Sequence, residues 1–203
     1  KDLINQHFKD ADIVHHLAGI TDVPRIKSQS NIEKDNKIRL VGEEGTQNIL
    51  DVINDNCKII FPSTHVIYEG IDKVEKEIKE DAESKPILSY STSKDINEKQ
   101  LKKSGKNYVI LRLGSVYGYS TDTTRIDIMP NLFSKIASQN GTLNLFSGGR
   151  QIKSLVPLID VARCFKFMEE REDLTFDTFN LTKDTITVKK VAEICKKYNP
   201  KIT

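Results

Sequence analysis

The stretch "NYVILRLGSVYG", residues 107–118, contains the strongest strand signal in the chain. It begins as a nearly continuous apolar run, contains Gly114 and ends at Gly118. Two shorter apolar runs, "ADIVHHLAG" (11–19) and "CKIIFPST" (57–64), have the same character and end in small or turn-forming residues. Continuous apolar strands are typical of a parallel sheet that is buried on both faces.

Helical patterns separate these strands. Residues 32–55 carry apolar side chains at helical spacing, and a helix with Tyr90 and Lys94 is expected to run to about Lys103 and to stop at Gly105. Further helices are expected near 129–139, 159–170 and 187–198, with strands in "TLNLF" (142–146) and "FDTFNLT" (176–182). The alternation predicts an α/β fold, a doubly wound parallel sheet covered by helices.

The bulk composition limits the classes of protein that fit. Of 203 residues, 37% are hydrophobic and 30% charged, with a formal net charge of +2, which argues against a polycation built for nucleic acid. No apolar run approaches the roughly 20 residues that span a membrane. Three widely spaced cysteines match no disulfide or metal pattern, so we expect a cytoplasmic protein.

The segment "SYSTSK", residues 89–94, places Tyr90 one helical turn before Lys94. An ammonium at that spacing can lower the pKa of the phenol and make it a usable acid or base. The same spacing also arises by chance in a lysine-rich chain. Ligands of parallel sheets bind beyond the carboxyl ends of the strands, where Gly19, Thr64 and Ser115 are expected, as is the loop that leads to Tyr90.

Six segments in order carry a resemblance to a known family. They are "HHLAG", "FPSTHVIYEG", "YSTSK", "LRLGSVYG", "SGGRQIKSLVPLIDVA" and "FNLTKDTITVKKVAEICKKY", and the resemblance extends from about residue 10 to residue 199. The set resembles the extended short-chain dehydrogenase/reductase family, the NAD-dependent epimerases and dehydratases of sugar nucleotides. Its patterns include S-S/T-x-x-x-Y-G, Y-x-x-x-K and R-x-x-N-V-Y-G-P. The resemblance implies a Rossmann-like domain over residues 1–120 and a small C-terminal substrate lobe over 121–203, with part of 155–182 returning to the main domain.

The resemblance also implies roles for individual residues. Tyr90 would be the general acid/base, Lys94 would hold the nicotinamide ribose and lower the pKa of Tyr90, and Thr64 would bind the reacting substrate oxygen. The other implied cofactor contacts are Leu17, Ala18, Gly19, Ser63, Leu113 and Gly114. The implied substrate contacts are His65, Ser115, Arg150 and Lys153. No metal is implied, and the adjacent His15 and His16 would point to opposite faces of a strand.

Several positions depart from the family pattern. The first strand and its G-x-x-G-x-x-G turn are absent, so roughly 50 residues are expected to precede this segment in a longer protein. "GEEG" (42–45) is no substitute, because it lies within a helix where the family has N-x-x-G-T and Gly42 replaces the Asn. Ser115 replaces an Asn, and Lys153 stands where an Arg clamps the diphosphate. His65 and Val66 replace the Asp-Glu pair of 4,6-dehydratases, which argues against that reaction.

We therefore predict an enzyme that uses NAD or NADP for epimerisation or a related oxidoreduction of a sugar nucleotide, and that forms a homodimer. Two alternatives remain open at this level. One is a reductase of a phosphate-free carbonyl substrate, which Ser115 and Lys153 admit. The other is a catalytically silent relative used for binding or regulation. The sequence leaves open which sugar, which nucleotide and which of the two cofactors is used.

Overall fold

The computed structural model describes residues 2–21, 28, 31–73, 75, 77–122 and 124–203. Within them the chain divides into two compact units, residues 1–112 with 165–180 and residues 113–164 with 181–203. Each unit is described below by itself. The domain boundary at residue 120, which the sequence analysis expects, stays a prediction for the complete protein.

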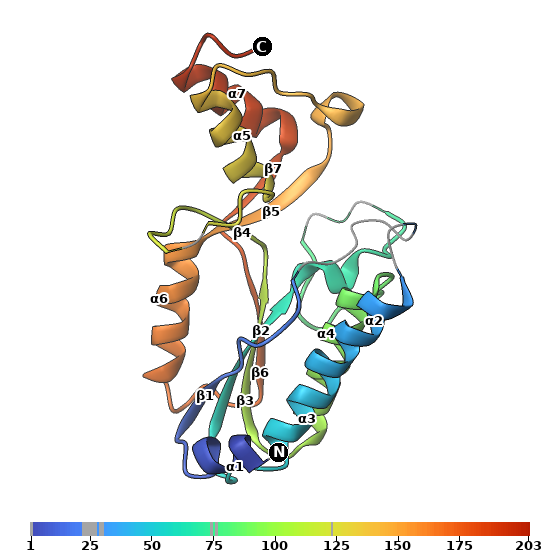
Figure 1. The fold of residues 1–203 in the computed structure, drawn as a ribbon, viewed down its shortest axis with the longest axis vertical. Coiled ribbons are helices and arrows are strands. Elements are labelled where there is room, and N and C mark those ends of the chain that lie inside the picture. The colour runs from blue at the N-terminus through green and yellow to red at the C-terminus, as the bar shows by residue number, and fades with distance from the viewer. Residues whose placement is uncertain (1, 22–27, 29–30, 74, 76, 123) are drawn as a thin grey trace. The chain divides into compact units, whose positions relative to one another are not determined.

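The first unit is built on a four-stranded sheet with the order β1-β2-β3-β6 (Figure 1). Its strands are β1 (Ile13–His15), β2 (Lys58–Thr64), β3 (Asn107–Leu113) and β6 (Asp177–Leu181). β1 and β2 run parallel, with Val14 opposite Ile59. β1 is shorter than the apolar run 11–19 indicates, because the chain after His16 leaves the sheet and is exposed.

Helices cover one face of this sheet. They are α1 (Asp2–Phe8), α2 (Ile32–Arg39), a π-helical turn (Leu40–Glu44), α3 (Gly45–Leu50) and α4 (Ser89–Lys103). Alternate strand residues such as Ile59, Phe61 and Ile110 form one apolar core with Leu50 and Leu101 of these helices. β2 is apolar on both faces, since Ile60, which alternates with Ile59 and Phe61 and so points away from these helices, is also fully buried.

The adjacent histidines His15 and His16, at the end of β1, point to opposite faces of the sheet. The ring of His15 packs edge-on against Phe165 and lies 2.9 Å from the Glu169 carboxylate, both in the last part of α6 (Leu158–Glu169). The ring of His16 faces the other side and meets Thr46 of α3. This opposition is what alternation along a strand predicts.

The second unit has a three-stranded sheet with the order β4-β5-β7 (Figure 1). β4 (Ser115–Tyr117) runs parallel to β5 (Ile152–Pro157), which pairs antiparallel with β7 (Asp184–Thr187). The helices α5 (Met129–Ser138) and α7 (Val188–Tyr198) complete it, and Phe133, Leu155 and Val191 lie in their shared core.

The stretch 107–118 is two strands rather than one, which corrects the sequence interpretation. β3 ends at Leu113 and β4 begins at Ser115, and the two belong to different sheets. Gly114 lies at the break, where a Cβ atom would come within 2.9 Å of the Ser154 carbonyl oxygen. A side chain there would collide with backbone, so glycine permits the change of sheet. The segment 142–146 forms no strand either.

Candidate active site

The carboxyl end of β2 carries two buried hydroxyl groups. Ser63 is 3% exposed, and its Oγ donates a hydrogen bond of 2.5 Å to Glu98 Oε1. Thr64 is also buried and caps the 3₁₀ turn His65–Tyr68, where its Oγ1 accepts from the amide of Val66 at 3.3 Å. Both hydroxyls thus have hydrogen-bond partners, and these contacts fix the end of the strand.

Helix α4 starts beside this strand end. Tyr90 is the second residue of the helix and is half-buried, and Lys94 lies one turn later with 9% of its surface exposed. Lys94 Nζ donates to the Pro62 carbonyl oxygen at 2.8 Å and lies 4.3 Å from the centre of the Phe61 ring. The lysine therefore ties the helix that bears Tyr90 to the last residues of β2.

Burial also sets the charge state of Lys94. Removal from water lowers its pKa from 10.5 to about 8, and the Glu98 carboxylate opposes that shift. At neutral pH most of the ammonium therefore keeps its proton. Such a charge within reach of Tyr90 would favour the phenolate form of the tyrosine.

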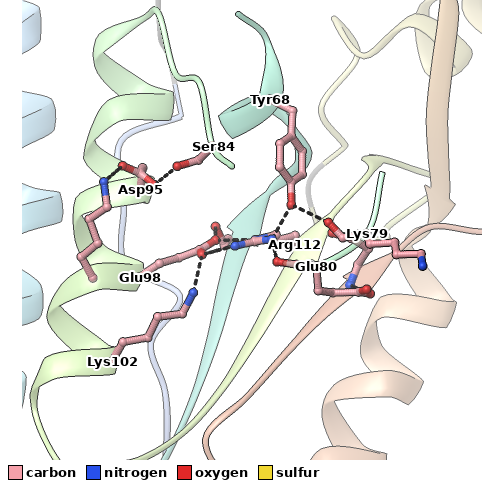
Figure 2. A network of polar contacts seen from close by, with 11 residues as sticks. Tyr68, Lys79, Glu80, Ser84, Asp95, Glu98, Lys102 and Arg112 are labelled. Atoms are coloured by element: carbon pink, nitrogen blue, oxygen red, sulfur yellow. Dashed lines mark hydrogen bonds and ion pairs between the residues drawn. The ribbon is translucent and has the colours of Figure 1, made fainter. Parts of the chain in front are cut away.

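A buried ion pair joins α4 to β3 (Figure 2). Arg112 of β3 donates to both carboxylate oxygens of Glu98, with the Nη2–Oε2 distance at 2.7 Å and Nε–Oε1 at 3.0 Å. Arg112 Nη1 also donates to the Tyr68 hydroxyl and, at 2.7 Å, to the Glu80 carbonyl oxygen. Glu98 and Arg112 are 2% and 4% exposed, so the pair is almost fully desolvated.

Sequence reasoning missed this pair, although a signal was present. Arg112 interrupts the apolar run "YVILRL", and an arginine inside a buried strand needs a buried anion. Glu98 lies one helical turn after Lys94, on the same face of α4. Through Ser63 and Arg112 the carboxylate connects α4, β2 and β3 near the predicted catalytic residues.

The end of β1 contributes a neutral histidine. His16 Nε2 lies 2.8 Å from Thr46 Oγ1, and the threonine donates its own proton to the Gly42 carbonyl oxygen at 2.6 Å. The ring must then be the donor, which assigns the proton to Nε2. Burial, with a smaller effect from the Lys94 charge, lowers the pKa of His16 from 6.5 to about 4.

The π-helical turn explains the unusual "GEEG" segment. Side chains of α4 bind its carbonyl oxygens, since Asn97 donates to Gly42 O at 3.0 Å and Gln100 to Glu43 O at 3.0 Å. A Cβ at Gly42 would lie 2.5 Å from Ser93 Oγ. Glycine at this position therefore lets the two helices approach closely.

The remaining predicted residues fall into two groups. Leu17, Ala18 and Gly19 are exposed just after β1, and His65 lies in the 3₁₀ turn, all in the first unit. The second unit holds five others, namely Leu113, Gly114, Ser115, Arg150 and Lys153. Arg150 and Lys153 are exposed there. In the first unit Lys94 reaches the carbonyl that precedes Ser63 and Thr64, and Tyr90 lies one turn before Lys94 in α4. The roles of all these residues stay predictions.

Two further observations concern the described part of the chain. No three or more histidine, cysteine, aspartate or glutamate side chains gather there in a way that could hold a metal ion. None of its helices has both the length and the apolar character needed to cross a bilayer.

The chain is similar to known proteins both in sequence and in fold. The family model described as "NAD dependent epimerase/dehydratase family" matches residues 1–182. Among curated proteins, none matches the sequence significantly. The fold matches the UDP-glucuronic acid 4-epimerase of Bacillus cereus with a TM-score of 0.79 and 21% identity, over 96% of this chain and 61% of that one.

Two UDP-glucose 4-epimerases are similar in the same way. That of Thermotoga maritima gives a TM-score of 0.81 and 19% identity, over 98% of this chain and 65% of its own. That of Thermus thermophilus gives 0.77 and 19%, over 100% and 68%. The chain thus spans less than two thirds of the first two structures. The likeness confirms the predicted Rossmann-like α/β fold.

Proposed function

We propose, since the chain belongs to the NAD dependent epimerase/dehydratase family, that the complete protein interconverts or oxidises a sugar nucleotide with NAD as cofactor. One observation carries the proposal. Lys94, one turn after Tyr90 on α4, donates to the Pro62 carbonyl oxygen, directly before Ser63 and Thr64. An acid/base phenol, a buried ammonium and two hydroxyls thereby share one end of the sheet.

The residues of the first unit fit a bound dinucleotide in two respects. Leu17, Ala18 and Gly19 are exposed after β1, and a Cβ at Gly19 would meet nothing within 4 Å, so the backbone is accessible there. Among the described residues, the one hydrogen-bond acceptor of Lys94 Nζ is Pro62 O. An ammonium has three donors, so others remain for ribose hydroxyls.

The proposed chemistry divides into proton transfer and electron transfer. NAD, when bound, would supply the acceptor for a hydride from the substrate carbon and could return that hydride. Tyr90, as phenolate, takes the proton of the sugar hydroxyl on that carbon. Thr64 donates a hydrogen bond to the same oxygen, and the Lys94 charge keeps the phenolate accessible near neutral pH. An epimerisation would be completed if the hydride returned to the opposite face of the resulting carbonyl carbon while Tyr90 gave its proton back to the oxygen.

The Bacillus cereus and Thermotoga maritima epimerases, whose structures contain UDP-glucuronic acid and UDP-glucose, support a nucleoside diphosphate as the part of the substrate that the protein binds. For this chain we assign that contact to Lys153, helped by Arg150, both exposed and three residues apart. A charged hydrogen bond to phosphate is typically worth about 1.5–3 kcal/mol. Lys153→Ala should therefore raise the dissociation constant of the nucleoside diphosphate by about 10- to 100-fold.

Calorimetry of the complete protein with UDP, GDP and dTDP tests the substrate class. We expect one of the three to bind, Lys153→Ala to weaken that binding, and added salt to weaken it more in the wild type than in the variant. NAD binding should be unchanged in the variant. A reductase of a phosphate-free carbonyl compound predicts no binding of UDP, GDP or dTDP in either protein. If none of the three nucleotides binds, the assignment of a sugar nucleotide as substrate is overturned.

A further inference from the structure

The first turn of α4 lacks the usual means of holding a helix start. Leu88 occupies the N-cap position, and Tyr90 follows as the second helical residue. Serine, threonine, aspartate and asparagine stabilise that position because their side chains accept a backbone amide, whereas leucine has no acceptor. A helix end without such a partner frays within its first turn. Tyr90 therefore sits where α4 would otherwise be least fixed.

One carboxylate from another part of the chain instead binds groups on both sides of Tyr90. Glu69 Oε1 accepts from the amide of Ile87 at 2.8 Å and from the amide of Leu88 at 2.7 Å. It also accepts from the hydroxyl of Ser91, the third residue of the helix. Ser91 in turn accepts from the Leu88 amide at 3.2 Å. Three donors on both sides of Tyr90 thus converge on a single oxygen.

Glu69 is itself held in place by the backbone around it. The amide of Lys85 donates to the Ile67 carbonyl at 2.7 Å, and the amide of Gly70 donates to the Lys85 carbonyl at 2.8 Å. A Cβ at Gly70 would lie 2.5 Å from that carbonyl, so glycine is needed for the close approach. The segment that follows Thr64 and the segment that precedes Tyr90 therefore lie side by side.

From this geometry we propose that Glu69 is a positioning residue that fixes the first turn of α4, and with it Tyr90, relative to Thr64. The inference rests on the proposed function. It goes beyond the family pattern, which has glycine after the tyrosine of S-S/T-x-x-x-Y-G, whereas this chain has Glu69 after Tyr68. Glu69 touches neither reacting group in this account and acts through the helix start alone.

Substitutions at Glu69 separate the acceptor from the charge. Glu69→Ala removes both, whereas Glu69→Gln keeps an oxygen of the same reach and loses only the charge. Glu83→Ala is the matched control, because Glu83 is an exposed glutamate of the same loop. All variants are made in the complete protein. Amide hydrogen exchange of residues 87–92 and turnover of UDP-glucose and UDP-glucuronic acid with NAD are then measured.

Glu69→Ala should speed exchange at Ile87 by at least about 10-fold, because this amide loses its acceptor, and should speed exchange at Leu88 as well, because that amide keeps only the longer contact with Ser91. Exchange in β3 should stay unchanged, which shows that the fold is intact. The kcat should fall about 5- to 10-fold, the scale of a lost helix cap, with the KM for NAD within about two-fold. Glu69→Gln should restore most of both effects, and Glu83→Ala should match the wild type.

Three results would overturn the inference. They are unchanged exchange in Glu69→Ala, faster exchange with unchanged kcat, and a glutamine variant that behaves like alanine. Failure of the proposed function looks different, since the wild type would then turn over neither sugar nucleotide. The exchange of residues 87–92 would still decide in that case whether Glu69 holds the helix start.

Discussion

Acidification should destabilise the folded chain through His16. Burial and the Lys94 charge lower the pKa of this residue from 6.5 to about 4, so the unfolded chain binds a proton at pH values where the folded chain does not. The stability that depends on neutral His16 is present above about pH 6.5 and is lost as the pH falls toward 4. The full effect of the shift is roughly 3 kcal/mol.

Most of this loss falls within an accessible pH range. Proton linkage of this one group, with a pKa of about 4 in the folded chain and 6.5 in the unfolded chain, predicts that the wild type loses about 2 kcal/mol of stability through His16 between about pH 7.5 and about pH 5. In His16→Gln that contribution should be absent, while the side-chain amide can still donate to Thr46. In His7→Gln, which alters an exposed histidine, the wild-type pH dependence should persist.

Urea unfolding at both pH values, with m-values compared, measures the difference. A titration of the His16 ring by NMR gives the pKa directly. The reasoning is refuted if wild type and His16→Gln lose the same stability between the two pH values. It is equally refuted if the ring titrates near 6.5.

Other consequences follow from the same structure. Glu98→Ala and Arg112→Ala should each cost about 3–5 kcal/mol in urea unfolding, with the double variant costing clearly less than the sum; additive costs would contradict a coupled buried pair. The pH profile of kcat/KM should fall as the pH rises through about 8, where Lys94 loses its proton, and a flat profile to about pH 10 would argue against its charge in the mechanism. We also predict a homodimer through the helix after Leu40 and α4, consistent with the exposed apolar side chain of Leu40; a monomer by light scattering at micromolar concentration would contradict it.

The sequence predicted the strand-helix order well because apolar runs and helical spacing record burial directly. The helix from Ser89 to Lys103 and its stop before Gly105 were predicted closely, and Gly105 indeed has a φ of +71°. The break at Gly114 was not predicted, because a change of sheet depends on Ser154 and Thr182, which lie far away in the sequence.

Of the candidate site, the sequence predicted the residues that one local pattern joins and missed those whose partners are distant in the sequence. Spacing within one segment indicated Tyr90 and Lys94, and Lys94 indeed meets the carbonyl that precedes Ser63 and Thr64. Glu69 and Glu98 were missed, because their partners come from segments 14 to 35 residues away in hydrogen bonds that no local pattern encodes. Such partners become visible only when the fold brings the segments together.

The role of Tyr90 as acid and base is the central claim, and one comparison tests it most directly. The complete protein, with NAD and either UDP-glucose or UDP-glucuronic acid, is followed by proton NMR of the sugar for wild type, Tyr90→Phe and Tyr119→Phe. Tyr119 is 82% exposed and serves as the control. The account predicts that Tyr90→Phe folds normally and loses at least about 100-fold in turnover, while Tyr119→Phe stays at the wild-type rate. A Tyr90→Phe variant with near wild-type turnover would contradict it.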